Sequence, residues 1–212
     1  MSNYDKMAEE ARKLFLSYDL EAIRRCWELE ADADALYLTY LGEPLCIERA
    51  TGRILPAQEG AFVSPGAVNE SMILYDLLTR TDPRPLPAGS WKSISELGGI
   101  IGSGHAKLLS HEKAAAPYTG KTALLRAACA RFGREEPAKA DVSFIFSVFG
   151  GFELWFRFWD GDEEFPAGIQ YLFDANALRF MHYETLWYLM NDLLEHIARH
   201  VRQIESEGSS KA

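Results

Sequence analysis

The sequence predicts an α+β fold, in which N-terminal and C-terminal helices pack against an antiparallel sheet. Strand-like segments rich in aromatic residues follow one another with only short connections between them. Segments with helical periodicity lie at both ends of the chain. Strands and helices are therefore grouped rather than strictly alternating, which is typical of α+β proteins.

The clearest strands lie in the C-terminal third. Gly150–Gly151 joins the first of three apolar runs to the second, and the turn DGDEEFPA (residues 160–167) joins the second to the third. The runs are DVSFIFSVF, FELWFRFW and GIQYLFD. Short polar or glycine links between such runs indicate antiparallel hairpins.

A helix from Tyr183 to about Ile204 closes the predicted fold. Its apolar residues recur at steps of four and three, so they lie on one face of the helix and form a buried stripe. These residues are Leu186, Met190, Leu193, Ile197, Val201 and Ile204.

The first part of the chain predicts two helices and then a small β-meander. The segment Met7–Glu30 is helical in character but breaks near Ser17–Asp19, where Asp19 is suited to cap the second helix. The meander follows within residues 36–48. Further helices are predicted at residues 69–79, 105–114 and 119–132.

Length and composition indicate one globular domain over residues 1–205, followed by a disordered tail over 206–212. Of the 212 residues, 48% are apolar and 25% are charged, which is ordinary for a folded domain. The net charge of −9 disfavours nucleic acid and anionic membranes as partners. No run of 18 apolar residues and no signal-peptide core occur, so we expect a cytoplasmic protein.

The three cysteines do not form a recognisable metal or disulfide framework. They are odd in number and far apart, and no C-x-x-C pair occurs. We therefore expect reduced thiols and no iron–sulfur cluster. No Ser/His/Asp or Cys/His arrangement is recognisable either, so the sequence leaves the catalytic residues, if any, unknown.

The stretch WDGDEEFPA is the first candidate site, for a ligand or a divalent cation. Hard cations bind several carboxylates that converge from a bent backbone. The candidate residues are Asp160, Asp162, Glu163, Glu164 and Asp174, the last of which ends a strand that could return close to Asp160. The other interpretation is a solvated hairpin turn, because Asp-Gly is a standard turn pair and consecutive acids seldom converge. We favour the turn.

A second candidate lies on the closing helix. Asp192, His196 and His200 are spaced at i, i+4 and i+8, so they form one line along the helix and could bind a metal ion. The same line borders the apolar stripe, where half-buried imidazoles are common, and histidines near a helix C-terminus are favoured without any ligand. Packing at this border is the interpretation we favour.

Several stretches, in their order along the chain, resemble DUF3786, a domain of unknown function from anaerobic bacteria and archaea. They include YLGEPLCIERATGRI, MILYDLL, LPAGSWKSISELGGI and ARFG, and the most specific block runs from Trp159 to Asp174. The resemblance covers most of the chain. It implies no established activity, although some relatives look fused or neighbouring to iron–sulfur and corrinoid-linked proteins, which implies a setting in anaerobic metabolism.

These observations favour a non-catalytic accessory module that binds a ligand or a protein partner. Its partner would meet the aromatic edge of the sheet or the acidic turn. The alternative is a metal-assisted hydrolase or lyase that uses the acidic cluster of residues 160–174, with His182 as an additional group. A purely structural subunit is the third alternative. The sequence does not determine the ligand or the oligomeric state.

Overall fold

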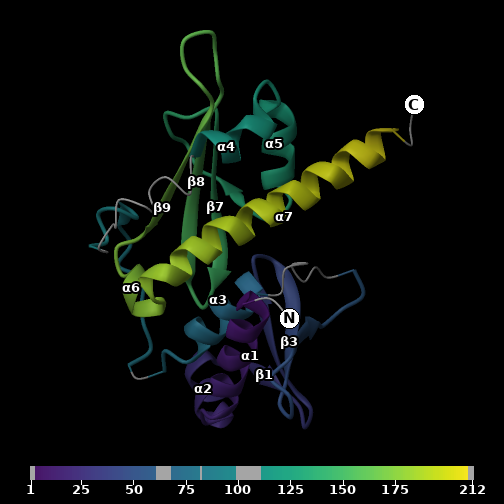
Figure 1. The fold of residues 1–212 in the computed structure, drawn as a ribbon, viewed down its shortest axis with the longest axis vertical. Coiled ribbons are helices and arrows are strands. Elements are labelled where there is room, and N and C mark those ends of the chain that lie inside the picture. Colours follow the sequence, from purple (N-terminus) through teal and green to yellow (C-terminus); the bar gives the residue numbers. More distant parts are fainter. Residues whose placement is uncertain (1–2, 61–67, 82, 99–110, 210–212) are drawn as a thin grey trace. The chain divides into compact units, whose positions relative to one another are not determined.

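The computed structural model describes residues 3–60, 68–81, 83–98 and 111–209, and it confirms the α+β class (Figure 1). The chain divides into two compact units. The first comprises Met1–Ala88, Val148–Phe152 and Asn176–Asp192, and the second comprises Gly89–Ser147, Glu153–Ala175 and Leu193–Ala212. A single domain over residues 1–205 stays a prediction. No helix in the described ranges is both long and apolar enough to cross a membrane.

The first unit begins with two helices that break where the sequence predicts. α1 covers Asn3–Leu16 and α2 covers Leu20–Trp27. The Asp19 carboxylate accepts hydrogen bonds from the backbone N–H groups of Glu21 (2.9 Å) and Ala22 (3.1 Å). Because these donors have no partner inside the helix, Asp19 supplies the N-cap that sets the start of α2.

A four-stranded antiparallel sheet follows in the first unit, in the order β1-β2-β3-β4. Leu41 and Gly42, which join β2 to β3, both have positive φ (45° and 81°). Two positive φ angles in a two-residue loop are the signature of a type I′ turn, whose twist matches that of the paired strands. The strands are β1 (Glu30–Ala31), β2 (Ala35–Tyr40), β3 (Glu43–Glu48) and β4 (Ile54–Pro56).

Helix α3, at Val68–Leu78, anchors α1 and the sheet region to each other. The ring of Tyr75 stacks on Phe15 of α1 at a centroid distance of 4.9 Å. Its hydroxyl donates to the carbonyl oxygen of Gly52 at 2.6 Å. One side chain of α3 therefore ties two neighbouring elements, and both rings are buried.

The β7–β8 turn belongs to the first unit and closes against α2. Gly150 and Gly151 have φ angles of 59° and 87°, which again give a type I′ turn. A Cβ atom at Gly150 would lie 2.5 Å from Cζ3 of Trp27. Only glycine therefore allows the turn to approach the indole this closely.

The second unit is built on a five-stranded antiparallel sheet in the order β5-β9-β8-β7-β6. The three aromatic runs form its central strands, as the sequence predicts. The buried residues of β8 alternate with partly exposed ones, so one face of this strand packs in the core. The strands are β5 (Trp91–Ser93), β6 (Arg134–Glu135), β7 (Val142–Phe149), β8 (Phe152–Trp159) and β9 (Gly168–Asp174).

The remaining helices are shorter or longer than the sequence predicts. The helix predicted at 105–114 lies partly outside the described residues. The helix predicted at 119–132 is confirmed as a shorter element, α5. The predicted stripe of α7 is buried from Leu186 to Ile197. α7 extends to Ser209, so residues 206–209, expected in the tail, are helical. The bounds are α4 (His111–Ala115), the 3₁₀ helix η1 (Ala116–Tyr118), α5 (Thr122–Cys129), α6 (Ala177–Phe180) and α7 (Tyr183–Ser209).

Candidate functional site

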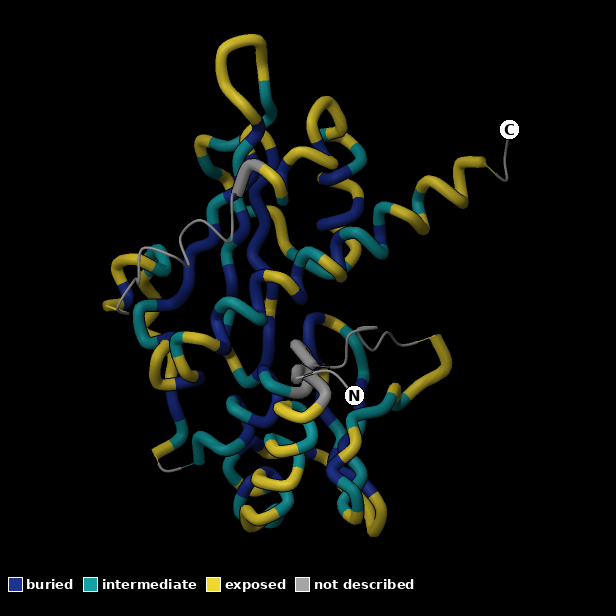
Figure 2. Tube along the Cα trace, in the orientation of Figure 1, coloured by how far each residue is buried: buried dark blue, intermediate teal, exposed yellow. Residues whose placement is uncertain are grey.

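The acidic stretch is the exposed connection between β8 and β9, and most of it is coloured as exposed in Figure 2. Its first carboxylate holds backbone in place. Asp160 Oδ1 accepts hydrogen bonds from the N–H groups of Gly120 (2.9 Å) and Gly161 (2.8 Å). Its own N–H donates to Asp141 Oδ2 at 2.7 Å. Asp160 therefore links this turn to the loop before α5.

The second carboxylate closes the turn itself. Asp162 Oδ1 accepts from the N–H groups of Glu164 (2.8 Å) and Phe165 (2.7 Å). These hydrogen bonds lower the pKa of Asp162, first through Phe165 and then through Glu164. Glu163 and Glu164 are exposed. The geometry is that of an Asp-initiated turn, in which the side chain substitutes for a backbone acceptor.

Asp174, the fifth candidate of the acidic site, lies at the far end of β9 from this turn. Trp159 pairs with Gly168 next to the turn, whereas Asp174 is the last residue of the strand and pairs with Trp91. Six residue steps along a strand span about 20 Å. Asp174 is buried and accepts a hydrogen bond from the N–H of Gly89 at 2.9 Å. The structure does not bring it to the other four carboxylates.

The three candidate ligands on α7 are buried. Asp192 Oδ2 accepts a hydrogen bond from the Tyr40 hydroxyl at 2.7 Å. In the second unit, Phe132 lies 6.1 Å from the ring of His196 and stacks on His200 at 4.9 Å. Burial is the main cause that lowers the pKa of His196 to about 3, so this imidazole is neutral at physiological pH.

Neither set forms a recognisable metal centre. Among the residues that the structure describes, no group of three or more His, Cys, Asp or Glu side chains is placed to hold a metal ion. Cation binding by the acidic turn, or by the line on α7, therefore stays a prediction from sequence.

The partly exposed face of β8 carries aromatic residues that are engaged with other side chains of the second unit. The guanidinium of Arg157 lies 3.7 Å from the ring centroid of Trp155, a cation–π contact. The Trp155 indole N–H donates to Ser143 Oγ at 3.0 Å, and Trp91 meets its ring edge-on at 5.4 Å. Trp159, 37% exposed, donates to the carbonyl oxygen of Lys139 at 2.7 Å. These contacts account for the aromatic run without a ligand.

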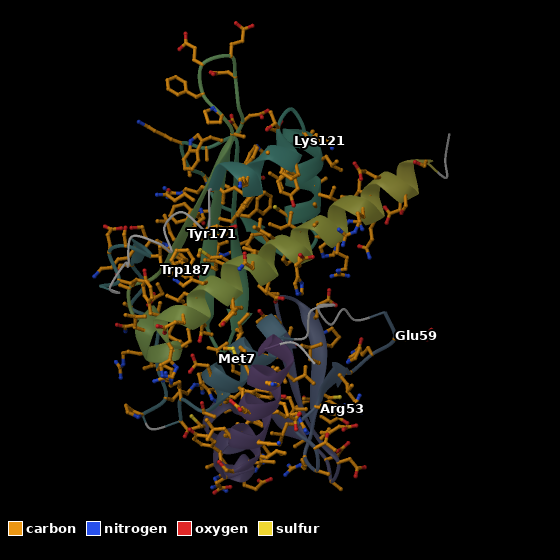
Figure 3. The ribbon with its side chains drawn as sticks, viewed as in Figure 1. Met7, Arg53, Glu59, Lys121, Tyr171 and Trp187 are labelled. Carbon is orange, nitrogen blue, oxygen red and sulfur yellow. The ribbon has the colours of Figure 1, made fainter. Side chains whose placement is uncertain are left out.

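A hollow of about 200 Å³ in the first unit is a stronger candidate. Apolar side chains from α1 and α3 form most of its wall, and polar groups of α3 and the start of α7 lie along one side. Leu14 of α1 and Tyr18, which follows this helix, remain 60% and 42% exposed. Met7 of α1, labelled in Figure 3, is 40% exposed. The lining residues are Ala11, Leu14, Phe15, Tyr18, Met72, Tyr75, Asp76, Thr79, His182 and Thr185.

Asp76 is the centre of the polar side, and its side chain is only 10% exposed. Oδ2 accepts from the backbone N–H of His182 (2.6 Å) and the hydroxyl of Thr185 (2.7 Å). Oδ1 accepts from Arg80 Nη2 at 3.1 Å and lies 2.8 Å from His182 Nδ1. Asp76 thus caps the first turn of α7 from a different helix, where its charge also complements the helix dipole.

His182 is held by this carboxylate while 68% of its side chain is exposed. Its Nδ1 lies 2.8 Å from both Asp76 Oδ1 and Arg80 Nη2. Arg80 can only donate, so Nδ1 accepts from Arg80 Nη2 when it is bare and donates to Asp76 Oδ1 when it is protonated. In both cases Nδ1 is engaged within the cluster, and Nε2 is the nitrogen available to a ligand.

The sequence names only one member of this cluster, His182, as an additional group for the acidic turn. A signal for the others is present in MILYDLL, where Asp76 stands within an apolar helical run. A carboxylate at such a position must be buried with partners or interrupt the apolar face. The partners could not be found from sequence, because His182 lies 106 residues further along the chain.

Comparison with known proteins agrees with the resemblance noted in the sequence. A family model described as a domain of unknown function (DUF3786) matches residues 19–196. Searches of curated proteins and of solved structures found no match. The matched range includes the whole polar cluster and begins after α1, which supplies part of the apolar wall of the hollow. The chain belongs to the DUF3786 family.

Proposed function

We propose that this protein is a non-catalytic binding module that holds a small molecule in the hollow of its first unit. The observation that carries this proposal is the composition of the wall, which is mostly apolar with hydrogen-bonding groups gathered on one side. Ligand sites typically combine an apolar surface with a few polar groups that fix the orientation.

The size of the hollow limits the ligand. Its volume of about 200 Å³ is below the roughly 300–1,000 Å³ of sites for drug-sized molecules. An engineered apolar cavity of about 150 Å³ accepts benzene. One ring with a short substituent therefore fits the hollow. The wall contains the rings of Phe15, Tyr18 and Tyr75, which favour a planar partner through edge-to-face contacts.

Binding is favoured over catalysis because the wall lacks an activated nucleophile. It contains no serine or cysteine among the described residues. The Thr185 hydroxyl donates to Asp76, and the Thr79 hydroxyl donates to the carbonyl oxygen of Tyr75 at 2.9 Å. The Asp76 carboxylate that faces Thr185 is already engaged by His182 and Arg80, and the carbonyl oxygen that faces Thr79 is too weak a base to take its proton. His182 and Asp76 are the lining groups with side chains suited to acid–base chemistry, and they engage each other.

Two parts of the sequence interpretation remain proposals of their own. An accessory role in anaerobic metabolism rests on the family resemblance alone. A metal-assisted hydrolase is less favoured, because Asp160 and Asp162 already accept backbone hydrogen bonds. Native mass spectrometry of protein purified without chelator tests it. A bound metal mass that disappears in the Asp160→Ala/Asp162→Ala variant would support that alternative.

The binding proposal can be tested by NMR with protein labelled at the methionine methyl groups. Met72 lines the hollow and is one of five methionines, so its methyl signal can be assigned by substitution. We expect 2-phenylethanol to shift the Met72 signal with a Kd of about 1 mM, which corresponds to roughly −4 kcal/mol.

Two tryptophan variants make this test specific. Ala11→Trp fills the hollow and should abolish the shift of Met72. Ala127→Trp places the same ring on an exposed position of α5 in the second unit and should leave the shift unchanged. If the Met72 signal does not move at about 10 mM ligand, a concentration well above the expected Kd, the hollow is not a ligand site.

A further inference from the structure

We infer that the ligand of this hollow is a small aromatic carboxylate, bound with its ring against the apolar wall and its anionic group at His182 and Arg80. This inference rests on the proposed binding function and adds the chemical class of the ligand. It follows from which hydrogen-bonding groups of the polar side are already occupied.

The Asp76 carboxylate has no capacity left for a cationic ligand. Its two oxygens receive the backbone N–H of His182, the Thr185 hydroxyl and Arg80, and Nδ1 of His182 lies at 2.8 Å. A carboxylate has about four lone-pair sites, and these contacts fill them. A ligand ammonium group would therefore have no carboxylate oxygen to bind, because Asp76 is buried and its lone pairs are occupied.

Donors, by contrast, remain available. Arg80 uses Nε and Nη2 toward Asp76, and among the described residues its Nη1 has no hydrogen-bond partner. The Arg80 side chain is 31% exposed; it does not itself line the hollow but contacts the lining residue His182 at 2.8 Å. Nε2 of His182 likewise has no partner within the described part of the chain, and the imidazole borders the hollow. The cluster can therefore still donate to an acceptor.

The charges favour a carboxylate as that acceptor. Asp76 balances Arg80, so His182 decides the net charge of the cluster. When His182 carries a proton on both nitrogens, Nδ1–H donates to Asp76 and Nε2–H donates to the ligand. The charges would then alternate from the ligand inward: the negative ligand carboxylate, the positive imidazolium of His182, the negative Asp76 and the positive Arg80. Hydrogen bonds between charged partners are about twice as strong as neutral ones.

The net charge of −9 does not outweigh this local arrangement. Exposed charges further away than the Debye length, about 8 Å at physiological ionic strength, are largely screened. Arg80 and His182 are in direct contact with each other at 2.8 Å, so both would act on a bound anion at short range.

Three probes of the same shape test the ligand class: phenylacetate, 2-phenylethanol and 2-phenylethylammonium, each titrated against the Met72 methyl signal. We expect phenylacetate to bind about tenfold more tightly than the alcohol, the gain typical of a charged hydrogen bond, and the ammonium probe to bind most weakly. Arg80→Gln and His182→Gln should each reduce the affinity for phenylacetate more than the affinity for the alcohol, and so remove the preference for phenylacetate. Arg80→Lys, which keeps the charge, should retain part of it.

The outcomes separate this inference from the proposed function. Equal affinity for all three probes, or tightest binding of the ammonium probe, would overturn the carboxylate inference and leave the binding function standing. If none of the probes shifts the Met72 signal, both are overturned. Circular dichroism of each variant confirms that it is folded, so a lost preference can be assigned to the side chain.

Discussion

Acidification should destabilise this protein between pH 6.5 and 5, and His196 should be the main cause. Its side chain is fully buried, and burial lowers its pKa from 6.5 to about 3. In the unfolded chain the imidazole is hydrated and regains its ordinary pKa. Below pH 6.5 the unfolded state therefore binds a proton that the folded state does not accept, and stability falls as the pH falls.

The size of this destabilisation follows from the difference between the pKa of His196 in the unfolded chain and its pKa in the folded protein. Each pH unit below 6.5 and above about 3 removes roughly 1.4 kcal/mol from the free energy of unfolding. At pH 5, His196 lowers the free energy of unfolding by roughly 2 kcal/mol. This is a large fraction of the total for a typical domain, which is about 5–15 kcal/mol. Most carboxylates titrate below this window, so histidine dominates there.

Urea unfolding at pH 7, 6 and 5, followed by tryptophan fluorescence, measures this effect in the wild type and in His196→Phe. Phenylalanine keeps a ring against Phe132 but cannot take up a proton. We expect the wild type to lose roughly 2 kcal/mol more than the variant between pH 7 and pH 5. Equal losses in the two proteins would refute the assignment to His196. Between pH 7 and 8 their stabilities should run in parallel.

Two further predictions concern packing. Gly150→Ala should lower the stability by roughly 2 kcal/mol or more in urea unfolding, because its Cβ would lie 2.5 Å from the Trp27 ring and its φ is 59°. Gly208→Ala, with nothing within 4 Å of the new Cβ, is the matched control and should not destabilise the protein. Cys129 is fully buried, and burial raises the pKa of its thiol, so a thiol reagent should modify it only after unfolding. Modification of all three cysteines in the native protein at one common rate would contradict this burial.

Local features of the fold were predictable because their causes lie close together in sequence. The break before α2 depends on Asp19 and the two N–H groups that follow it, all within three residues. The central hairpin depends on a pair of adjacent glycines, and the stripe of α7 depends on a spacing of three and four residues. Such patterns are short-range, so a single sequence contains them.

The candidate sites depended on distances that sequence does not encode directly. The sequence allows Asp174 to approach Asp160 across a hairpin, but the antiparallel register places the end of β8, next to Asp160, opposite the first residue of β9, whereas Asp174 is the last residue of β9. Two consecutive strands bring together residues at equal distances from their turn, and Asp174 is too far from it. Only the pairing of the strands decided this.

What the sequence determined by itself was the class of fold, the central strands, the main helices and the family. What only the tertiary structure decided was which residues form the candidate site. Asp76 lies on α3 and His182 immediately precedes α7, and the two residues meet although they are 106 positions apart in the sequence. The buried carboxylate must find donors, and the unpaired N–H groups at the start of α7 need an acceptor. Each requirement is visible in the sequence, but the partner that satisfies it is chosen by the packing of the whole unit.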